Sequence, residues 1–218
     1  MKNRLASLVF LPLLSGLLTG SGCGETSSQP AGRAEHPTRQ DACDSPDAPI
    51  GCCFARVPAA LTATLILGQP GEPGEPLLIS GTLLRADGRT PYPGVLLYAY
   101  QTDHTGHYTK KGDETGVQKW HGHLHGWARS DAQGRYAIRS TRPAPYPSRT
   151  MPAHIHAAIK EPGNQAPYYI SDFVFQDDPL VSAQYLATVP AIGGTGVVAL
   201  RRTVDGGWAG RRDIVLKQ

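Results

Sequence analysis

Short apolar runs separated by turn-forming residues make up most of the chain after about residue 60. The runs are rich in β-branched and aromatic residues, and clusters of Gly, Pro and Asp lie between them, which is typical of a sandwich or barrel. We therefore predict an all-β fold, an antiparallel β-sandwich with at least eight strands. The strands are expected within residues 61–66, 77–84, 95–100, 136–139, 155–159, 168–175, 196–200 and 213–216.

Two turn signals and one helical segment complete this pattern. Residues 86–89 (Ala-Asp-Gly-Arg) and 130–135 (Ser-Asp-Ala-Gln-Gly-Arg) carry Asp and Gly where tight turns need them, so both predict chain reversals. Residues 179–186 follow the acidic pair Asp177-Asp178, and their pattern predicts a helix of about two turns.

The beginning of the chain has a different pattern. Lys2 and Arg4 precede an apolar run over residues 5–18, and small residues then lead to Cys23. This order is that of a secretory signal peptide, and the run is too short for a membrane-spanning helix. The small residues before Cys23 resemble a bacterial lipobox, so we predict a signal peptide over residues 1–22 and lipidation of Cys23. The alternative is an ordinary cleaved signal with an incidental cysteine.

The next segment lacks periodic apolar positions and holds three closely spaced cysteines. Its first part is Ser, Thr, Gln, Pro and Gly with charged residues, which indicates a flexible tether. In an oxidising compartment Cys43 is expected to pair with Cys52 or Cys53, whereas a metal–thiolate site lacks further ligands at suitable spacing. The predicted organisation is a signal peptide over 1–22, a tether and disulfide-pinned start over 23–54, and a β-sandwich domain over 55–218.

Composition narrows the class of protein. A chain of 218 residues suffices for one sizeable domain, and 25 Gly with 19 Pro disfavour a helical architecture. The formal net charge is only +3 and no block of like charges occurs, so no nucleic-acid partner is expected. We predict an exported protein, either a membrane-anchored lipoprotein or a periplasmic or extracellular one, whose membrane contact is the lipid on Cys23.

The candidate chemistry lies in four residues. His154 and His156 stand at i and i+2 of a predicted strand, so both point to one face and can reach one metal ion. Tyr146 lies between two prolines, and Tyr108 follows a strand and a Gly turn. Taken singly, the histidines fit a solvent-exposed strand face and the tyrosines fit packing. Two tyrosines together with the His pair form a much rarer combination.

These motifs resemble those of the intradiol ring-cleavage dioxygenases, the family that includes protocatechuate 3,4-dioxygenase and catechol 1,2-dioxygenase. Order, spacing and residue types agree over about residues 80–178. The segments that carry the resemblance are 95–108 (Val-Leu-Leu-Tyr-Ala-Tyr-Gln-Thr-Asp-His-Thr-Gly-His-Tyr), 126–136 (Gly-Trp-Ala-Arg-Ser-Asp-Ala-Gln-Gly-Arg-Tyr), 141–147 (Thr-Arg-Pro-Ala-Pro-Tyr-Pro) and 152–156 (Pro-Ala-His-Ile-His).

The resemblance implies an intradiol-type sandwich with long loops and one non-haem Fe(III) bound by Tyr108, Tyr146, His154 and His156. The donor types agree with ferric iron, because a free tyrosine has a pKa of about 10 and only a strongly Lewis-acidic cation holds two tyrosinates at neutral pH. In the family, the tyrosine at the position of Tyr146 leaves the iron when substrate binds and takes a substrate proton.

The implied reaction inserts both atoms of O2 into a catechol-type aromatic. The ring is cleaved between the two hydroxyl-bearing carbons, and a cis,cis-muconate-type diacid results. Together with export, this implies breakdown of aromatic compounds met outside the cytoplasm.

One position departs from the family pattern. Many members have Arg before the Pro-Ala-His-Ile-His motif, where it would stabilise negative charge on the substrate, and this chain has Met151. Loss of that cation would cost on the order of a few kcal/mol of transition-state stabilisation. Arg149 is the nearest substitute, so Arg149 and Tyr146 are the predicted catalytic residues; Arg129 and Arg142 are further candidates. The alternatives are a degenerate homologue that only binds metal and a non-catalytic transthyretin-like or carboxypeptidase-regulatory-like module.

A second histidine cluster lies outside the family motif. His121, His123 and His125 alternate, so they would share one face if their segment were a strand. One interpretation is a second site for copper or zinc, completed by His104 or His107. The interpretation that we favour is a polar strand face at the entrance of the main site.

Overall fold

The structure is a computed structural model that describes residues 41–163 and 165–217. The predicted signal peptide, most of the tether and the lipidation of Cys23 lie outside these residues. Within them, no helix has both the length and the apolar character needed to span a membrane.

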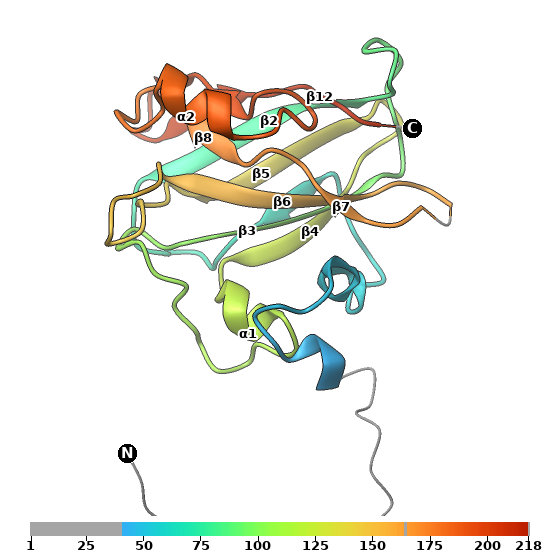
Figure 1. Cartoon of the computed structure of the whole chain (residues 1–218), viewed down its shortest axis with the longest axis horizontal. Helices are drawn as coiled ribbons and strands as arrows, with labels where there is room; N and C mark the ends of the chain where they lie inside the picture. Colours follow the sequence, from blue (N-terminus) through green and yellow to red (C-terminus); the bar gives the residue numbers. More distant parts are fainter. Residues whose placement is uncertain (1–40, 164, 218) are drawn as a thin grey trace, which may run out of the picture. The chain divides into compact units, whose positions relative to one another are not determined.

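Two six-stranded sheets form the body of the described part (Figure 1). In the first sheet the order is β1-β5-β2-β11-β10, and β12 also pairs with β2. Its strands are β1 (Thr64–Ile66), β5 (Arg135–Thr141), β2 (Pro76–Leu84), β11 (Trp208–Arg211), β10 (Leu200–Arg202) and β12 (Ile214–Val215).

In the second sheet the order is β4-β3-β6-β8-β9, and β7 also pairs with β6. Its strands are β4 (His125–Arg129), β3 (Leu96–Gln101), β6 (His154–Lys160), β8 (Phe173–Phe175), β9 (Val197–Val198) and β7 (Tyr168–Tyr169). The helices of the described residues are α1 (Gln118–His121), α2 (Ala183–Thr188) and two short 3₁₀ helices, Asp41–Cys43 and Ile50–Phe54.

The main core lies between the two sheets. Successive side chains of a strand point to opposite faces, and β2 alternates between buried and more exposed positions accordingly. The largest side chains of this core that are fully buried are Tyr136, Phe173, Phe175, Leu65, Ile79, Leu83, Leu97, Leu124, Ile138, Ile155 and Ile159. Burying each such aliphatic side chain contributes about 1.5–3 kcal/mol, so this layer is the main stabilising element.

A second apolar cluster covers the other face of β3 and β6. Cys53 and Phe54 of the second 3₁₀ helix pack there with Tyr98 and Ala158. The indole of Trp127 donates a hydrogen bond to the carbonyl oxygen of Cys53 at 2.7 Å. Because both of its faces are covered, β6 is buried along almost its whole length.

The predicted all-β class is confirmed, and the prediction of an antiparallel sandwich is corrected in one respect. Four strand pairs, β1–β5, β2–β11, β2–β12 and β8–β9, are parallel, so both sheets are mixed. Parallel neighbours need long crossover connections, and long segments separate the strands of each of these pairs in the sequence. Alternation of apolar residues shows which face is buried but not the direction of the neighbouring strand.

The strand predictions miss two strands and overlap a third, β10, only at its first residue, Leu200. Every one of the eight runs contains a strand, and the run over 168–175 divides into β7 and β8. The missed strands are β4 and β11, whose buried positions are small residues such as Ala128 and Ala209 that give little apolar signal. The predicted helix begins later than expected, because the Ser182 hydroxyl caps α2 by accepting a hydrogen bond from the amide of Tyr185.

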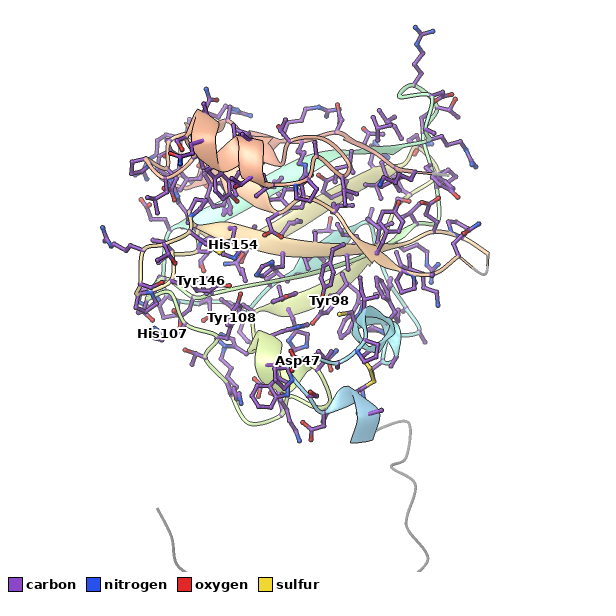
Figure 2. The ribbon with its side chains drawn as sticks, viewed as in Figure 1. Asp47, Tyr98, His107, Tyr108, Tyr146 and His154 are labelled. Atoms are coloured by element: carbon purple, nitrogen blue, oxygen red, sulfur yellow. A yellow bond between two sulfur atoms is a disulfide. The ribbon has the colours of Figure 1, made fainter. Side chains whose placement is uncertain are left out.

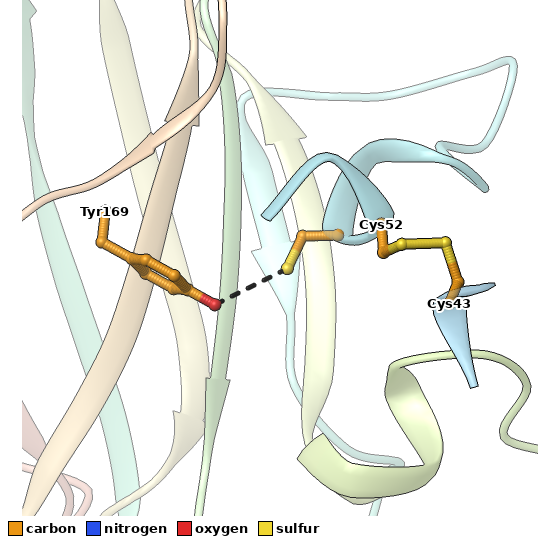
Figure 3. Close-up of a disulfide and its surroundings, with 4 residues drawn as sticks. Cys43, Cys52 and Tyr169 are labelled. Carbon is orange, nitrogen blue, oxygen red and sulfur yellow. Dashed lines mark hydrogen bonds between the residues drawn. A yellow bond between two sulfur atoms is a disulfide. The ribbon is translucent and has the colours of Figure 1, made fainter. Parts of the chain in front are cut away.

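The disulfide joins Cys43 to Cys52 (Figure 3), which selects one of the two predicted pairings. Cys53 is the remaining cysteine of the described residues; it is buried, and its Sγ lies 3.9 Å from the hydroxyl of Tyr169. Burial raises the pKa of the Cys53 thiol to about 11, so it is a poor nucleophile at neutral pH.

We expect removal of the disulfide to weaken the fold. Closing a loop between residues nine apart in sequence restricts the unfolded chain and stabilises the protein by about 2–3 kcal/mol. The double variant Cys43→Ser/Cys52→Ser should lose that amount in urea denaturation, whereas Cys53→Ser should lose less. Equal stability of the double variant and the wild type would contradict this role of the bond.

Candidate metal centre

The four predicted donor residues lie together at the start of β6. The hydroxyl of Tyr146 lies 2.7 Å from the hydroxyl of Tyr108, 3.2 Å from His154 Nε2 and 3.3 Å from His156 Nε2. The two Nε2 atoms are 3.0 Å apart. Figure 2 shows Tyr108, Tyr146 and His154 gathered on one side of the molecule. Two oxygens and two nitrogens from three segments thus converge on one point.

The two histidines are held by the centre of the second sheet. His154 pairs with Val174 of β8, and His156 pairs with Tyr100 of β3. The spacing i and i+2 on one strand brings both imidazoles to the same face, as predicted. His154 is almost fully buried, and 20% of the His156 side chain is exposed.

Two loops carry the tyrosines, and hydrogen bonds tie these loops together. Tyr108 follows β3 and Tyr146 precedes β6. The Thr102 hydroxyl donates to the carbonyl of Ala144 at 2.7 Å, and the amide of Ala144 donates to the carbonyl of Asp103 at 3.0 Å. The two phenol groups therefore keep their relative position through a direct contact between their loops.

The carboxylate of Asp103 shapes the loop that presents Tyr108. It accepts hydrogen bonds from the amides of Thr105 and His107 and from the hydroxyls of Thr105 and Thr109. Burial acts to raise the pKa of Asp103, but these hydrogen bonds outweigh it and hold the pKa well below its usual range. Asp103 is therefore ionised at neutral and mildly acidic pH.

The hydrogen bonds of the two imidazoles determine which nitrogen carries the proton. His154 Nδ1 lies 2.7 Å from the carbonyl oxygen of Pro152, and His156 Nδ1 lies 3.0 Å from Oδ1 of Asp172. Both partners accept, so both Nδ1 atoms carry protons, and each Nε2 presents a lone pair in the neutral imidazole. Two lone pairs 3.0 Å apart repel each other, and a cation between them would remove that repulsion.

The tyrosines need a strong Lewis acid to ionise. Burial, followed by the hydrogen bond with Tyr146, raises the pKa of Tyr108 well above its usual value. Burial also raises the pKa of Tyr146, the hydrogen bond with Tyr108 acts in the opposite direction, and the charge of Asp172 adds to the increase. Two phenolate oxygens with two imidazole nitrogens form a donor set that suits a hard trivalent ion such as Fe(III). The residues present therefore fit ferric iron.

Asp172 is a site residue that the sequence analysis did not identify. His154, His156 and Asp172 each place one possible ligand atom within 4.8 Å of the others. Among residues 41–163 and 165–217, no other group of three His, Cys, Asp or Glu residues does so. The carboxylate contacts the Nδ1 edge of His156, however, whereas the other donors face Nε2. Asp172 thus orients His156 rather than completing the donor set. The only trace in the sequence is the polar interruption of the apolar run over 168–175.

An aromatic stack supports the same histidine. The ring of Tyr100 lies 4.6 Å from that of His156, and the ring of His121 stacks on the other side of Tyr100 at 3.6 Å and 6°. His121 Nδ1 is 2.7 Å from the hydroxyl of Tyr98. The sequence analysis assigned no role to Tyr100, which restricts the His156 ring from one side.

The three-histidine cluster does not form a shared face. His121 ends α1, Gly122 follows with φ 71°, and only His125 belongs to a strand. His123 uses both ring nitrogens, on the carbonyl of Thr109 and the carboxylate of Glu72. Within the described part of the chain these histidines belong to no group that could hold a second metal, and the face that we favoured is absent.

Within the described residues, none of the three candidate arginines forms a hydrogen bond with the four predicted metal donors. Arg149 is exposed, has φ 51° and lines a hollow of about 290 Å³ next to Asp177. Arg142 donates to both carboxylate oxygens of Asp177 at 2.8 and 2.9 Å. Arg129 is exposed at the end of β4, and Met151 is partly buried. A catalytic role of Arg149 stays a prediction.

The metal-free protein should become less stable as the pH is lowered, because of His121. Burial, followed by the charges of His156 and His125, lowers the pKa of His121 to about 3. Between that value and 6.5 the unfolded chain binds a proton that the folded state rejects, so stability present above 6.5 is lost on acidification. The expected loss is on the order of 2 kcal/mol between pH 6.5 and about 4.5.

Urea denaturation at a series of pH values checks this expectation. The variant His121→Gln should show a shallower slope than the wild type, although His125 and His154, whose pKa values are also lowered by burial, leave part of it. His104→Gln, which changes an exposed histidine, is the control. Identical slopes for His121→Gln and the wild type would exclude His121 as the source.

Comparison with known proteins gives one family and a set of related folds. The family profile described as "Dioxygenase" matches residues 51–215. A solved dioxygenase domain from a dioxygenase carbohydrate-binding protein fusion of Streptomyces sp. SirexAA-E is 24% identical, with a TM-score of 0.55 over 75% of this chain and 94% of that one.

Two further structures share the fold over 75% of this chain. The 3-chlorocatechol 1,2-dioxygenase from Rhodococcus opacus 1CP is 19% identical, with a TM-score of 0.52 over 69% of its length. The hydroxyquinol 1,2-dioxygenase from Pseudomonas putida DLL-E4 is 25% identical, with a TM-score of 0.52 over 62% of its length.

Proposed function

Since the chain belongs to the intradiol ring-cleavage dioxygenase family, we propose that it is a non-haem Fe(III)-dependent enzyme that inserts both atoms of O2 into a catechol-type aromatic. The product would be a cis,cis-muconate-type diacid. The observation that carries the proposal is the convergence of Tyr108, Tyr146, His154 and His156, with both Nε2 atoms near the Tyr146 oxygen, which in turn contacts the Tyr108 hydroxyl. Two solved relatives whose names specify a chlorocatechol and a hydroxyquinol support the substrate class.

Each of the four residues has a role in this proposal. Bound Fe(III) would supply Lewis acidity and a template for the two catechol oxygens. Tyr108, His154 and His156 would remain its ligands throughout. The carbonyl of Pro152 and the carboxylate of Asp172 hold the imidazoles with Nε2 free for this role. Tyr108 is held by the loop that Asp103 shapes, so its oxygen keeps its place during the reaction.

Tyr146 is the proton acceptor. It lies outside both sheets and is followed by the exposed segment 147–150. The loop backbones are tied together, but the side chain of Tyr146 can turn away from the histidines by rotation about its own bonds. Its phenolate oxygen takes a proton from a substrate hydroxyl, a transfer between chemically similar phenols that needs little driving force. The direct contact with the Tyr108 hydroxyl provides a partner for the protonated Tyr146 oxygen.

Iron loading and a colour test check the proposal. Purified protein with Fe(III) should turn wine-red through tyrosinate-to-iron charge transfer, and Tyr146→Phe should shift or weaken that band. Tyr168→Phe, which removes a hydroxyl bonded to Glu161 away from the centre, should leave the band unchanged. Oxygen uptake should then follow the addition of catechols to the red protein.

The outcomes separate this proposal from its alternatives. A colourless protein that binds no iron would exclude the dioxygenase and favour a transthyretin-like or carboxypeptidase-regulatory-like binding module. A red protein that is inert toward a whole panel of catechols would favour a degenerate homologue that only binds metal, for which Met151 is the motivating residue.

We further propose that the protein acts outside the cytoplasm, anchored by a lipid on Cys23. The disulfide between Cys43 and Cys52 supports an oxidising compartment. In a bacterial host the full chain should partition with membranes, and Cys23→Ala should release it. A cytoplasmic, reduced wild-type protein would contradict export.

A further inference from the structure

Asp172 is a charged group close to the donor cluster, with a carboxylate oxygen within 4.8 Å of a ring nitrogen of both His154 and His156. It lies in the break between β7 and β8, and its Oδ1 contacts Nδ1 of His156 at 3.0 Å. The side chain is 24% exposed, similar to the 20% of His156, so both open toward solvent. The carboxylate is therefore partly exposed beside a partly exposed donor of the cluster.

The backbone around Asp172 is fixed from several sides. The Ser171 hydroxyl donates to the carbonyl of Pro190 at 2.5 Å and accepts from the amide of Ile192 at 2.9 Å. The buried guanidinium of Arg212 donates to the carbonyl of Ser171 at 2.8 Å and lies over the ring of Phe173. A carboxylate on so constrained a segment acts as a fixed charge, because it cannot move away from a repelled ligand.

The effect of this charge reaches the whole centre. The charge of Asp172 raises the pKa of four tyrosines from four different segments, in each case after burial as the larger cause. These tyrosines are Tyr108, Tyr146, Tyr169 and Tyr185. For Tyr146 it is the one charged side chain among the causes of the shift. The charge of Asp172 therefore acts on both phenol groups of the cluster.

Among the described residues, no Lys or Arg forms an ion pair with Asp172, whose one contact with a basic side chain is that with His156. Arg142 is paired with Asp177. The guanidinium of Arg212 is bonded to the carbonyls of Ser171 and Gly193; burial lowers its pKa, and the charge of Asp172 acts in the opposite direction without a direct ion pair. Arg149 is exposed and lines the hollow next to Asp177. The further nearby carboxylate, Asp178, adds to the negative side and accepts hydrogen bonds from backbone amides.

We infer that Asp172 determines substrate specificity, so that the centre prefers catechols whose ring carries a neutral or basic substituent over those that carry a carboxylate. This inference rests on the proposed function, since it concerns the ligand of the same site. A bound catecholate already brings negative charge to the donors, and a ring carboxylate adds a second charge near Asp172. At an effective dielectric constant of about 20–40 and a separation of about 8–10 Å, the expected discrimination is about threefold or more.

The test is an anaerobic titration of the iron-loaded protein with three catechols that differ only in one ring substituent. The probes are dihydroxybenzoate, methylcatechol and dopamine, and the change in the charge-transfer spectrum gives a dissociation constant for each. The variant Asp172→Asn removes the charge but keeps an oxygen that accepts from His156 Nδ1. The control is Asp131→Asn, the same substitution in the turn that follows β4.

In the wild type and in Asp131→Asn, dihydroxybenzoate should bind more weakly than dopamine by about threefold or more, with methylcatechol between them. Asp172→Asn should narrow that ratio at least about threefold. A merely structural role of Asp172 would change the binding of all three probes equally and leave the ratio as it was. That result, or a wild type that binds dihydroxybenzoate most tightly, would overturn the inference.

Two further outcomes keep the inference and the proposed function apart. If Asp172→Asn does not hold iron, the ratio of the dissociation constants of dihydroxybenzoate and dopamine is measured in the wild type at rising salt concentration. Salt screens the charge of Asp172 and should narrow this ratio. A ratio that stays constant would overturn the inference. A wild type without any iron–tyrosinate band would overturn the proposed function and this inference together. A normal band with an unchanged ratio would overturn the inference alone.

Discussion

Replacing His154 with alanine should abolish iron binding and ring cleavage. The Nδ1 proton of His154 is held by the carbonyl of Pro152, so its Nε2 is committed to the centre, and no other imidazole of the described residues lies at that position. Changing groups that merely support a metal ligand costs 10–100-fold in affinity, so loss of a ligand should cost at least about 100-fold. Competition with a chelator and the absorption of the charge-transfer band measure the effect.

The matched control for this variant is His125→Gln. His125 lies in the same sheet, and its Nδ1 contacts the carbonyl of Gly122 rather than the donor cluster. Its replacement should leave iron affinity within a few fold of the wild type. Retention of a normal red band by His154→Ala would contradict the ligand set and move the metal, if any is bound, to another group of residues.

Replacing Gly106 with alanine should separate the two loops that carry the tyrosines. Gly106 has φ 86°, and a Cβ there would lie 2.2 Å from the carbonyl oxygen of Pro145, one residue before Tyr146. The left-handed conformation costs about 1–2 kcal/mol for alanine, and the clash with backbone adds about 1–3 kcal/mol. Relief of the clash displaces Tyr146 from Tyr108, and a displacement of about 1 Å can lower the rate of a reaction about 100-fold.

Gly112→Ala isolates the clash from the conformational strain. Gly112 lies in the same connection after β3 with φ 98°, but a Cβ at that position would have no neighbouring atom within 4 Å. The variant should lose only the conformational part of the stability, about 1–2 kcal/mol, and retain its iron band. Urea denaturation, the charge-transfer spectrum and oxygen uptake compare the two variants. Equal effects of both would show that the close approach of the loops is unimportant.

Much of the fold follows from local patterns. The apolar runs identify the strands of both sheets because one face of each strand is buried between them, and this requirement is visible residue by residue. β4 and β11 escape detection because their buried positions hold small residues such as Ala128 and Ala209, which give little apolar signal. The late start of α2 depends on a single hydroxyl, that of Ser182, which the general pattern does not distinguish.

The candidate site divides in the same way. The i, i+2 spacing places His154 and His156 on one face of a strand, and the family resemblance of the motifs adds Tyr108 and Tyr146, which the structure brings next to them. Asp172 and Tyr100 are not found, although both contact His156. A lone Asp or Tyr in an apolar run carries no signal of its own, and its role arises only when a neighbouring strand brings it against the imidazole.

Local sequence was therefore enough for the strand-rich class, the turns and the shared face of His154 and His156, because alternation and i, i+2 spacing act over a few residues, whereas Tyr108 and Tyr146 were expected beside them from the family resemblance. The folded chain alone selected Cys52 as the partner of Cys43, the four parallel strand pairs, and Asp172 as the orienting charge on His156. These choices depend on which distant segments meet. That is decided by how two sheets share one core, and each strand pattern is compatible with several neighbours.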